Sequence, residues 1–153
     1  MHLAEVLRPD MFWPNLSSKT KQEIIKELSE RIAGVHVELD SLEIAKILME
    51  REKLGSTGIQ DGIAIPHGKV PGIEHVIVAC GTSNRGIDFE SHDQKPTNIF
   101  FVLLAPEFAA GQHLKILARL SRLLKEENIR EGLISLDDGK KMCEYMTEED
   151  KNI

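Results

Sequence analysis

One nine-residue run constrains the fold of this chain more than any other stretch of its sequence. Residues Thr97–Ala105 read TNIFFVLLA, are apolar almost without interruption, and are followed directly by Pro106. A short continuous apolar run that ends at a residue without an N–H group is typical of a strand covered on both faces of a sheet. The run therefore predicts a central strand with further elements on both sides of it.

Apolar residues recur at helical spacing in three other segments, Ser17–Ala33, Ser41–Leu54 and Gly111–Lys125. This spacing predicts three amphipathic helices, two before the apolar run and one after it. The inner face of the third predicted helix has five members: Leu114, Leu117, Leu120, Ser121 and Leu124. Residues 127–146 predict one or two further short helices at the end of the chain.

Polar residues indicate where these helices begin. Serines at the start of Ser17–Ala33 are candidate N-caps, because a hydroxyl can accept a free N–H group of the first turn. Asp40 followed by Glu43 resembles a capping box for the second helix. Asp137 or Asp138 is expected to cap the last helix.

The middle of the chain is predicted to form β-strands. Gly62–Ile65 and His75–Gly81 are short apolar runs, and Gly86–Glu90 predicts a short edge strand. Helices, then strands, then helices around one apolar strand indicate a layered α/β architecture. No Pro/Gly/Ser-rich linker and no internal repeat divides the sequence, so residues 1–153 are expected to form a single domain.

The composition narrows the class of protein. The 153 residues are 41% hydrophobic and 29% charged, as in ordinary globular proteins. The net charge of −6 argues against a general nucleic-acid binder, which usually has a basic face. Two cysteines without a CxxC pair indicate a reducing compartment. Because no apolar stretch reaches membrane-spanning length and no signal peptide is evident, we expect a cytoplasmic protein without membrane insertion.

A histidine follows one of the predicted strands in an unusual setting. Residues 62–69 read GIAIPHGK, so His67 lies between Pro66, which has no N–H group for a sheet ladder, and Gly68, which tolerates unusual backbone angles. The neutral form of such a histidine is populated near pH 7, and its ring nitrogen can attack phosphorus or take a proton. A hydrogen-bonded histidine in a turn is the alternative interpretation.

A glycine-punctuated loop precedes this histidine. Residues 55–62 read GSTGIQDG and can direct backbone N–H groups toward an anion, with Ser56 and Thr57 at the start of the loop. An ordinary helix-to-strand turn is the alternative. The loop is not a Walker A motif and no GxGxxG occurs, so the sequence gives nucleotide binding no support.

Two further residues are suited to an anion. Arg51, near the end of the second predicted helix, has a planar donor fork that matches phosphate oxygens, and His113 opens the third, whose N-terminus favours anions. Each is also compatible with a solvated residue at a helix end. The six histidines include no HxxxH or HxH pair and no Cys–His spacing fits zinc, so no metal site is predicted. No nucleophile motif of a hydrolase occurs either.

Taken together, these motifs resemble a known family. Residues 51–69, REKLGSTGIQDGIAIPHGK, resemble the phosphorylation-site region of the type-2 enzyme IIA domains, the fructose/mannitol and nitrogen-regulatory IIA components of the bacterial phosphotransferase system. GIDFES at residues 86–91, FFVLLAPE at residues 100–107 and HLKILARLSRLL at residues 113–124 resemble later segments of the same family. The resemblance extends roughly from Leu3 to Met146.

The resemblance implies a three-layer α/β/α fold around a mixed β-sheet, and a phosphohistidine mechanism. His67 would accept a phosphoryl group from the phosphohistidine of HPr, or of its nitrogen-branch relative, with no metal, nucleotide or other cofactor. His113 would be the second active-site histidine, and Arg51 would stabilise the phosphate. The candidates for the phosphate cradle are Ser56, Thr57 and Gly68.

The residues leave the branch of the family open. A standalone nitrogen-regulatory IIA would act through phosphorylation-dependent binding to target proteins, whereas a sugar-transport IIA would pass the phosphoryl group to a IIB component. The absence of an attached IIB or membrane domain favours regulation. Another alternative is a binding module with the fold of the anion-exchanger cytoplasmic domain, for which the resemblance implies no phosphohistidine chemistry. The presence of Arg51, His67 and His113 argues against that alternative.

Overall fold

The predicted central strand lies in the middle of a mixed sheet. In the computed structural model, which describes residues 1–153, β5 is Thr97–Ala105, with the predicted bounds. It pairs antiparallel with β4, Ile77–Ile87, and parallel with β2, Ile63–Ala64, and with β3, His67–Lys69. β1, Phe12–Trp13, runs parallel to β4 at the opposite edge. The strand order β1-β4-β5-β2, with β3 also paired to β5, was not predictable from the residues alone.

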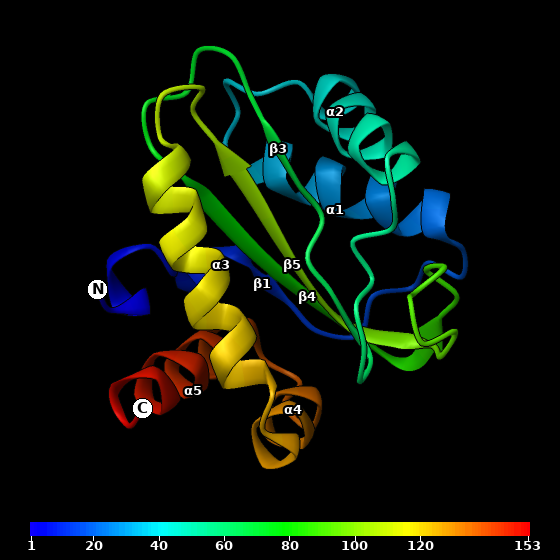
Figure 1. Cartoon of the computed structure of the whole chain (residues 1–153), viewed down its shortest axis with the longest axis vertical. Helices are drawn as coiled ribbons and strands as arrows, with labels where there is room; N and C mark the ends of the chain where they lie inside the picture. Colours follow the sequence, from blue (N-terminus) through cyan, green and yellow to red (C-terminus); the bar gives the residue numbers. More distant parts are fainter.

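Helices cover both faces of this sheet (Figure 1). On one face lie α1, Lys21–Val35, and α2, Ser41–Lys53. On the other lie α3, Ala110–Leu124, α4, Glu127–Ile134, and α5, Gly139–Lys151. The three-layer α/β/α fold with a mixed sheet is therefore confirmed. No helix is both long and apolar enough to cross a membrane.

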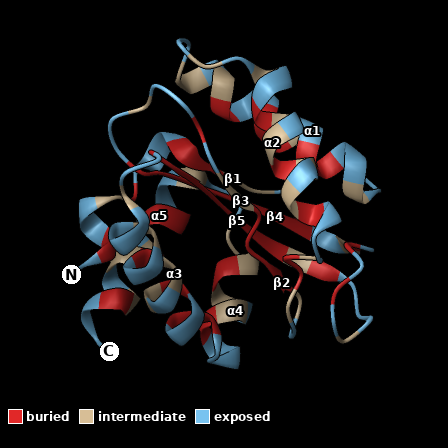
Figure 2. Ribbon diagram, turned by 45° about the horizontal axis from the view of Figure 1, so that its top comes forward, coloured by how far each residue is buried: buried red, intermediate tan, exposed pale blue.

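The side chains of β5 divide between two cores, because successive residues of a strand point to opposite faces of a sheet. Residues Ile99, Phe101, Leu103 and Ala105 pack with the helices α3, α4 and α5. Residues Phe100, Val102 and Leu104 pack with α1 and α2. All seven are at most 1% exposed, and the sheet lies in the buried centre of Figure 2. Burying each large side chain contributes about 1.5–3 kcal/mol to the free energy of unfolding, so the packing of β5 stabilises both helical layers against the sheet.

A buried carboxylate joins the two ends of the chain. Asp150 of α5 accepts the N–H group of Leu3 at 2.7 Å and forms an ion pair with Arg119 of α3. Leu3 begins the short 3-10 helix η1, Leu3–Glu5, and a second one, η2, is Pro9–Met11. Since a buried charge is stable only when it is paired and hydrogen-bonded, these contacts hold η1 against the helical layer.

The predicted start of the first helix is wrong by a few residues. Thr20 is the N-cap of α1: its hydroxyl accepts the N–H group of Glu23, whose carboxylate accepts the N–H group of Thr20. Ser17 and Ser18 instead hydrogen-bond Glu27. A glutamate three residues after Thr20 completes a capping box, and neither serine has one at that spacing. Of the other predicted caps, Asp138 is the N-cap of α5, and Asp40 is the N-cap of α2 but accepts only the N–H group of Leu42, without the capping box expected with Glu43.

Two further expectations need correction. The inner face predicted for α3 is wrong at Leu114 and Ser121, which are exposed. Its buried residues are Ile116, Leu120, Leu123 and Leu124. Apolar residues on more than one side of the helix made the buried face ambiguous. The separate edge strand predicted at Gly86–Glu90 is also wrong, because Gly86 and Ile87 are the last residues of β4 beyond an irregularity in its pairing.

Candidate functional site

His67 begins β3, and the backbone around it fixes its ring. Pro66 lacks an N–H group but its carbonyl accepts the N–H group of Leu103 at 3.0 Å, so the strand register is kept. The ring atom Nδ1 lies 2.8 Å from the carbonyl oxygen of Ile65, two residues back. A carbonyl can only accept, so Nδ1 carries the proton and Nε2 is the unprotonated, accepting nitrogen. His67 thus presents an unprotonated nitrogen away from the backbone.

Arg51, in the last turn of α2, contacts Nε2 of His67. Its Nε donates to His67 Nε2 at 3.3 Å, and its Nη1 donates to the carbonyl oxygen of Gly55 at 2.9 Å. The second bond ties the guanidinium to the turn that follows the helix. The structure therefore brings together two residues that are 16 positions apart in the chain, and places a permanent positive charge beside the unprotonated nitrogen of His67.

His113 lies in the first turn of α3, opposite His67. The two ring centroids are 5.1 Å apart and the planes are nearly perpendicular, at 89°. Burial lowers the pKa of His113 below its usual 6.5, and electrostatic interaction with His67 and Lys69 lowers it further. The ring is consequently neutral near pH 7. No side chain caps α3, so the first N–H groups of this helix add to the attraction for an anion.

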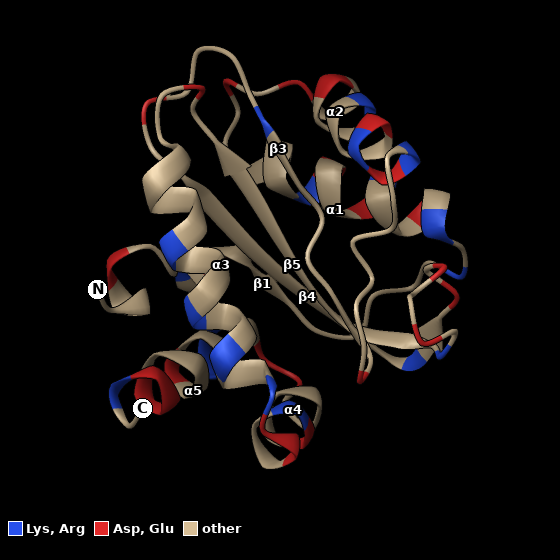
Figure 3. Cartoon of the chain, in the orientation of Figure 1, with Lys and Arg blue, Asp and Glu red and all other residues tan.

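These three residues line one open cavity of about 350 Å³. Its lining consists of Ile47, Glu50, Arg51, Leu54, His67, Gly68, Lys69 and His113. Lys69, the basic residue of β3 in Figure 3, was not predicted. The signal was available, because residues i and i+2 of a strand lie on the same face and Lys69 is two positions after His67. No group of three or more His, Cys, Asp or Glu side chains is placed to hold a metal ion.

Two of the candidates for the phosphate cradle, Ser56 and Thr57, lie outside the cavity around His67. Ser56 Oγ donates to the carbonyl oxygen of Phe89 at 2.9 Å, and the buried Thr57 hydroxyl donates to Glu52. Neither residue lines the cavity around His67. In this structure the two hydroxyls therefore hold the loop in place.

Gly68 lines the cavity, and its neighbours give a further reason for a glycine. A Cβ atom added at Gly68 would lie 2.5 Å from Cγ2 of Ile47, a side chain of α2. Because Cγ2 is attached directly to a branched Cβ, it cannot move away without a shift of the helix. Gly68 therefore allows β3 to pack closely against the helix that carries Arg51.

We expect Gly68→Ala to destabilise the protein by about 1–3 kcal/mol through overpacking. The double variant Gly68→Ala/Ile47→Ala should lose less stability than the sum of the two single changes, because the truncated Ile47 leaves room for the new methyl group. Urea unfolding of the four proteins measures this coupling. Strict additivity would show that the contact with Ile47 does not determine the choice of glycine.

Comparison with known proteins identifies the family of this chain. The sequence model of the family described as "Phosphoenolpyruvate-dependent sugar phosphotransferase system, EIIA 2" matches residues 5–149, which include all the cavity residues. The chain belongs to this family. An EIIA 2 relative, the nitrogen regulatory protein of Bradyrhizobium diazoefficiens, is 38% identical over 133 residues, which are 87% of this chain and 86% of the relative.

The chain is also similar to a component of a sugar system. The fructose-specific EIIABC component of Bacillus subtilis is 33% identical over 151 residues, and the match covers 99% of this chain but only 24% of that larger protein. Among solved structures, the nitrogen regulatory protein IIA-Ntr from Neisseria meningitidis superposes with a TM-score of 0.87 at 29% identity, over 95% of this chain and 99% of that one. The fold of this EIIA 2 chain is thus the fold of IIA proteins.

Proposed function

We propose that this EIIA 2 protein is a phosphoryl carrier in which Nε2 of His67 accepts the phosphoryl group. The donor would be the phosphohistidine of HPr or of its nitrogen-branch relative. The observation that carries the proposal is the hydrogen bond from His67 Nδ1 to the carbonyl oxygen of Ile65, because it leaves Nε2 unprotonated, with its lone pair toward Arg51. Family membership supports a phosphotransfer role in general.

The transfer needs only groups that the two proteins supply. The Nε2 lone pair of His67 attacks phosphorus in line with the donor nitrogen, a new N–P bond forms, and the donor N–P bond breaks. The bonding electron pair returns to the donor imidazole. Charge on the three equatorial oxygens is stabilised by positive groups and N–H donors, which is the main requirement of phosphoryl transfer. In this proposal Arg51, Lys69 and the uncapped start of α3 supply them, which is supported by the position of Arg51, Lys69 and His113 around one cavity.

The surroundings of the cavity suit a protein donor. Leu54 lines the cavity and is 84% exposed, and Leu114, next to His113, is 65% exposed. Exposed apolar residues around an open polar site mark a surface for a macromolecule more often than for a small substrate. α3 also carries basic residues and no acidic one (Figure 3), so its field favours a negatively charged phosphodonor.

We further propose that the carrier belongs to the nitrogen-regulatory branch, where its phosphorylation state controls binding to target proteins. The match to the nitrogen regulatory protein of Bradyrhizobium diazoefficiens and the TM-score of 0.87 with IIA-Ntr support this choice. A sugar-transport IIA that passes the phosphoryl group to a IIB component is the second candidate. The fructose-specific EIIA component of Haloferax volcanii supports it, at 38% identity over 101 residues.

Reconstitution tests the carrier chemistry. The protein is incubated with phosphoenolpyruvate, enzyme I and either HPr or its nitrogen-branch relative, and the product is examined for acid-labile, base-stable phosphate. Histidine labelled with ¹⁵N then locates the phosphorus by NMR, and we expect it on Nε2 of His67. No phosphate in the presence of competent donors, or phosphate on His113 instead, would contradict the proposal. Transfer from the phosphorylated protein to a fructose- or mannitol-type IIB would favour the transport branch.

The titration of His113 gives an independent prediction. Burial lowers the pKa of its ring below 6.5, so the midpoint of an NMR titration should lie below that value in the unphosphorylated protein. A phosphoryl group on the neighbouring His67 adds about −1.5 to −2 charges, which favours the protonated ring and raises the midpoint. An unchanged midpoint after phosphorylation would show that His113 does not interact with the phosphoryl group. His75, which is exposed and lies outside the cavity, serves as the reference histidine.

A further inference from the structure

Glu52 is a buried carboxylate beside Arg51 that the transfer chemistry does not use. Its side chain is only 2% exposed. One oxygen accepts the N–H group of Thr57 at 3.0 Å and pairs with Nζ of Lys21 at 2.9 Å, and the other accepts the Thr57 hydroxyl. Both oxygens therefore have partners, and the negative charge is compensated inside the protein.

The ordinary role of a polar residue at a helix end does not explain this arrangement. The free groups at the C-terminal end of α2 are carbonyls, to which Leu54 donates its N–H group, and the Glu52 carboxylate cannot cap them because it only accepts hydrogen bonds. A buried ion pair contributes little net stability, because desolvation offsets most of the attraction. Its two bonds to a single residue do, however, fix the orientation of Thr57 relative to α2.

Thr57 is connected in turn to the ring of His67. The carbonyl oxygen of Thr57 accepts the N–H group of Ile65 at 3.1 Å, and the carbonyl oxygen of Ile65 is the acceptor for His67 Nδ1 at 2.8 Å. One series of hydrogen bonds thus runs from Glu52 through Thr57 and Ile65 to the nitrogen opposite the nucleophile. The same turn contains the Gly55 carbonyl that holds Arg51.

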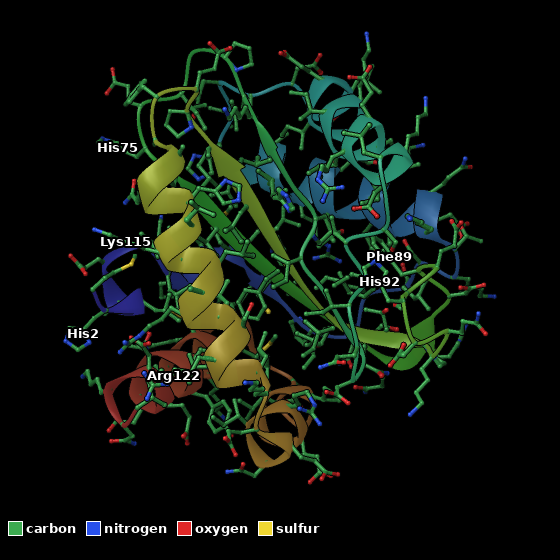
Figure 4. All side chains as sticks on the ribbon, in the orientation of Figure 1. His2, His75, Phe89, His92, Lys115 and Arg122 are labelled. Carbon is green, nitrogen blue, oxygen red and sulfur yellow. The ribbon has the colours of Figure 1, made fainter.

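We propose that Glu52 and Thr57 are positioning residues for phosphoryl acceptance: together they hold the Ile65 carbonyl where it keeps His67 in the Nδ1–H form, with Nε2 toward Arg51. This inference rests on the proposed role of His67 as acceptor. Lys21 completes the arrangement, since its Nζ neutralises Glu52 and lies 4.7 Å from the ring centroid of Phe89. Figure 4 shows Phe89 and His92 beside the end of α2, where Ser56 hydrogen-bonds both residues.

Thr57→Val removes the hydroxyl with little change in volume, whereas Thr57→Ser keeps the hydroxyl. Thr97→Val is the matched control, because Thr97 is also fully buried and its hydroxyl is hydrogen-bonded, to Ser91, outside this series. For each protein, rapid-quench kinetics give the rate of phosphoryl acceptance from phosphorylated HPr or its relative. The ¹⁵N shifts of His67 give its tautomer, and thermal unfolding gives the stability.

We expect Thr57→Val to slow acceptance at least about tenfold, because small errors in the orientation of a reacting group cost that much or more. The fraction of His67 in the Nε2–H form should rise at the same time. Thr57→Ser and Thr97→Val should stay within about twofold of the wild-type rate and keep its tautomer, even where Thr97→Val is less stable. A normal rate and tautomer in folded Thr57→Val would overturn the proposal.

Glu52→Gln is the second variant and covers the case in which Thr57→Val does not fold. The amide keeps one acceptor oxygen. It can neither accept both bonds from Thr57 nor neutralise the charge of Lys21, so we expect the same rise in the Nε2–H form of His67. An unaltered tautomer in this variant would also overturn the proposal. The tautomer of His67 is measured without any phosphodonor. The positioning role can therefore be tested even if the wild-type protein takes up no phosphate. Failure of the wild-type protein to take up phosphate would contradict only the proposed carrier function.

Discussion

Replacing His67 with glutamine is expected to abolish phosphoryl acceptance. Glutamine has a similar reach and keeps polar atoms in the cavity, but its amide nitrogen has no available lone pair and cannot attack phosphorus. Loss of a nucleophile that forms a covalent intermediate lowers the rate by at least about 10⁴-fold. The measurement is incorporation of phosphate from phosphoenolpyruvate through enzyme I and HPr or its relative, followed over a time long enough to detect slow labelling.

His75→Gln is the control for this experiment. His75, labelled in Figure 4, is exposed and lies outside the cavity that contains His67, so the same substitution there should leave labelling at the wild-type level. Since His67 is half-buried at the start of an edge strand, the His67→Gln protein should remain folded, and its circular dichroism spectrum verifies this. Acid-labile phosphate on folded His67→Gln would assign the acceptor to another residue, with His113 the first to examine.

The second large effect is expected at Arg51. Its guanidinium donates to the nucleophilic nitrogen before transfer and lies where the equatorial oxygens would gather during transfer. Removing one such preorganised donor from a site of developing charge costs about 10²–10³-fold in rate. We therefore expect Arg51→Gln to slow acceptance by that factor without changing which residue is labelled.

Arg51→Lys separates charge from geometry. Lysine keeps the positive charge but has a single donor atom in place of the planar fork, and it cannot contact His67 and the Gly55 carbonyl in the same way. Its rate should lie between those of wild type and Arg51→Gln. Lys53→Gln, an exposed change at the end of the same helix, is the control and should be nearly neutral. Equal rates for Arg51→Gln and wild type would exclude a role for the guanidinium in the transfer.

The layers of the fold were predictable because their causes are local. The nearly continuous apolar run at Thr97–Ala105 indicated a strand buried on both faces, and the apolar faces of the predicted helices required a sheet to pack on. The order of the strands was not predictable, because strands that pair in the sheet are far apart in the chain. The helix boundaries failed where two signals competed, as at the start of α1, where Thr20 and Glu23 form the capping box in place of the two serines before them.

For the candidate site, the sequence predicted which residues lie close together better than it predicted the direction of their side chains. Arg51, His67 and His113 were named from motifs, and they do lie together. Ser56 and Thr57 are candidates for the phosphate cradle on sequence grounds, and in the structure their hydroxyls hydrogen-bond the Phe89 carbonyl and the Glu52 carboxylate. Spacing along a chain says which residues are near one another, but the direction of each side chain depends on partners brought by folding.

The pairing of β5 has a consequence for how the protein is made. β2 and β3, the strands on either side of Pro66, pair with β5 and with no other strand. A chain that leaves the ribosome from its N-terminus therefore exposes His67 well before the strand that holds it has been synthesised. His113 follows later still. A nascent or prematurely released chain that lacks β5 contains His67 without the strand that fixes its position, so the proposed phosphoryl acceptance requires a chain synthesised at least as far as His113.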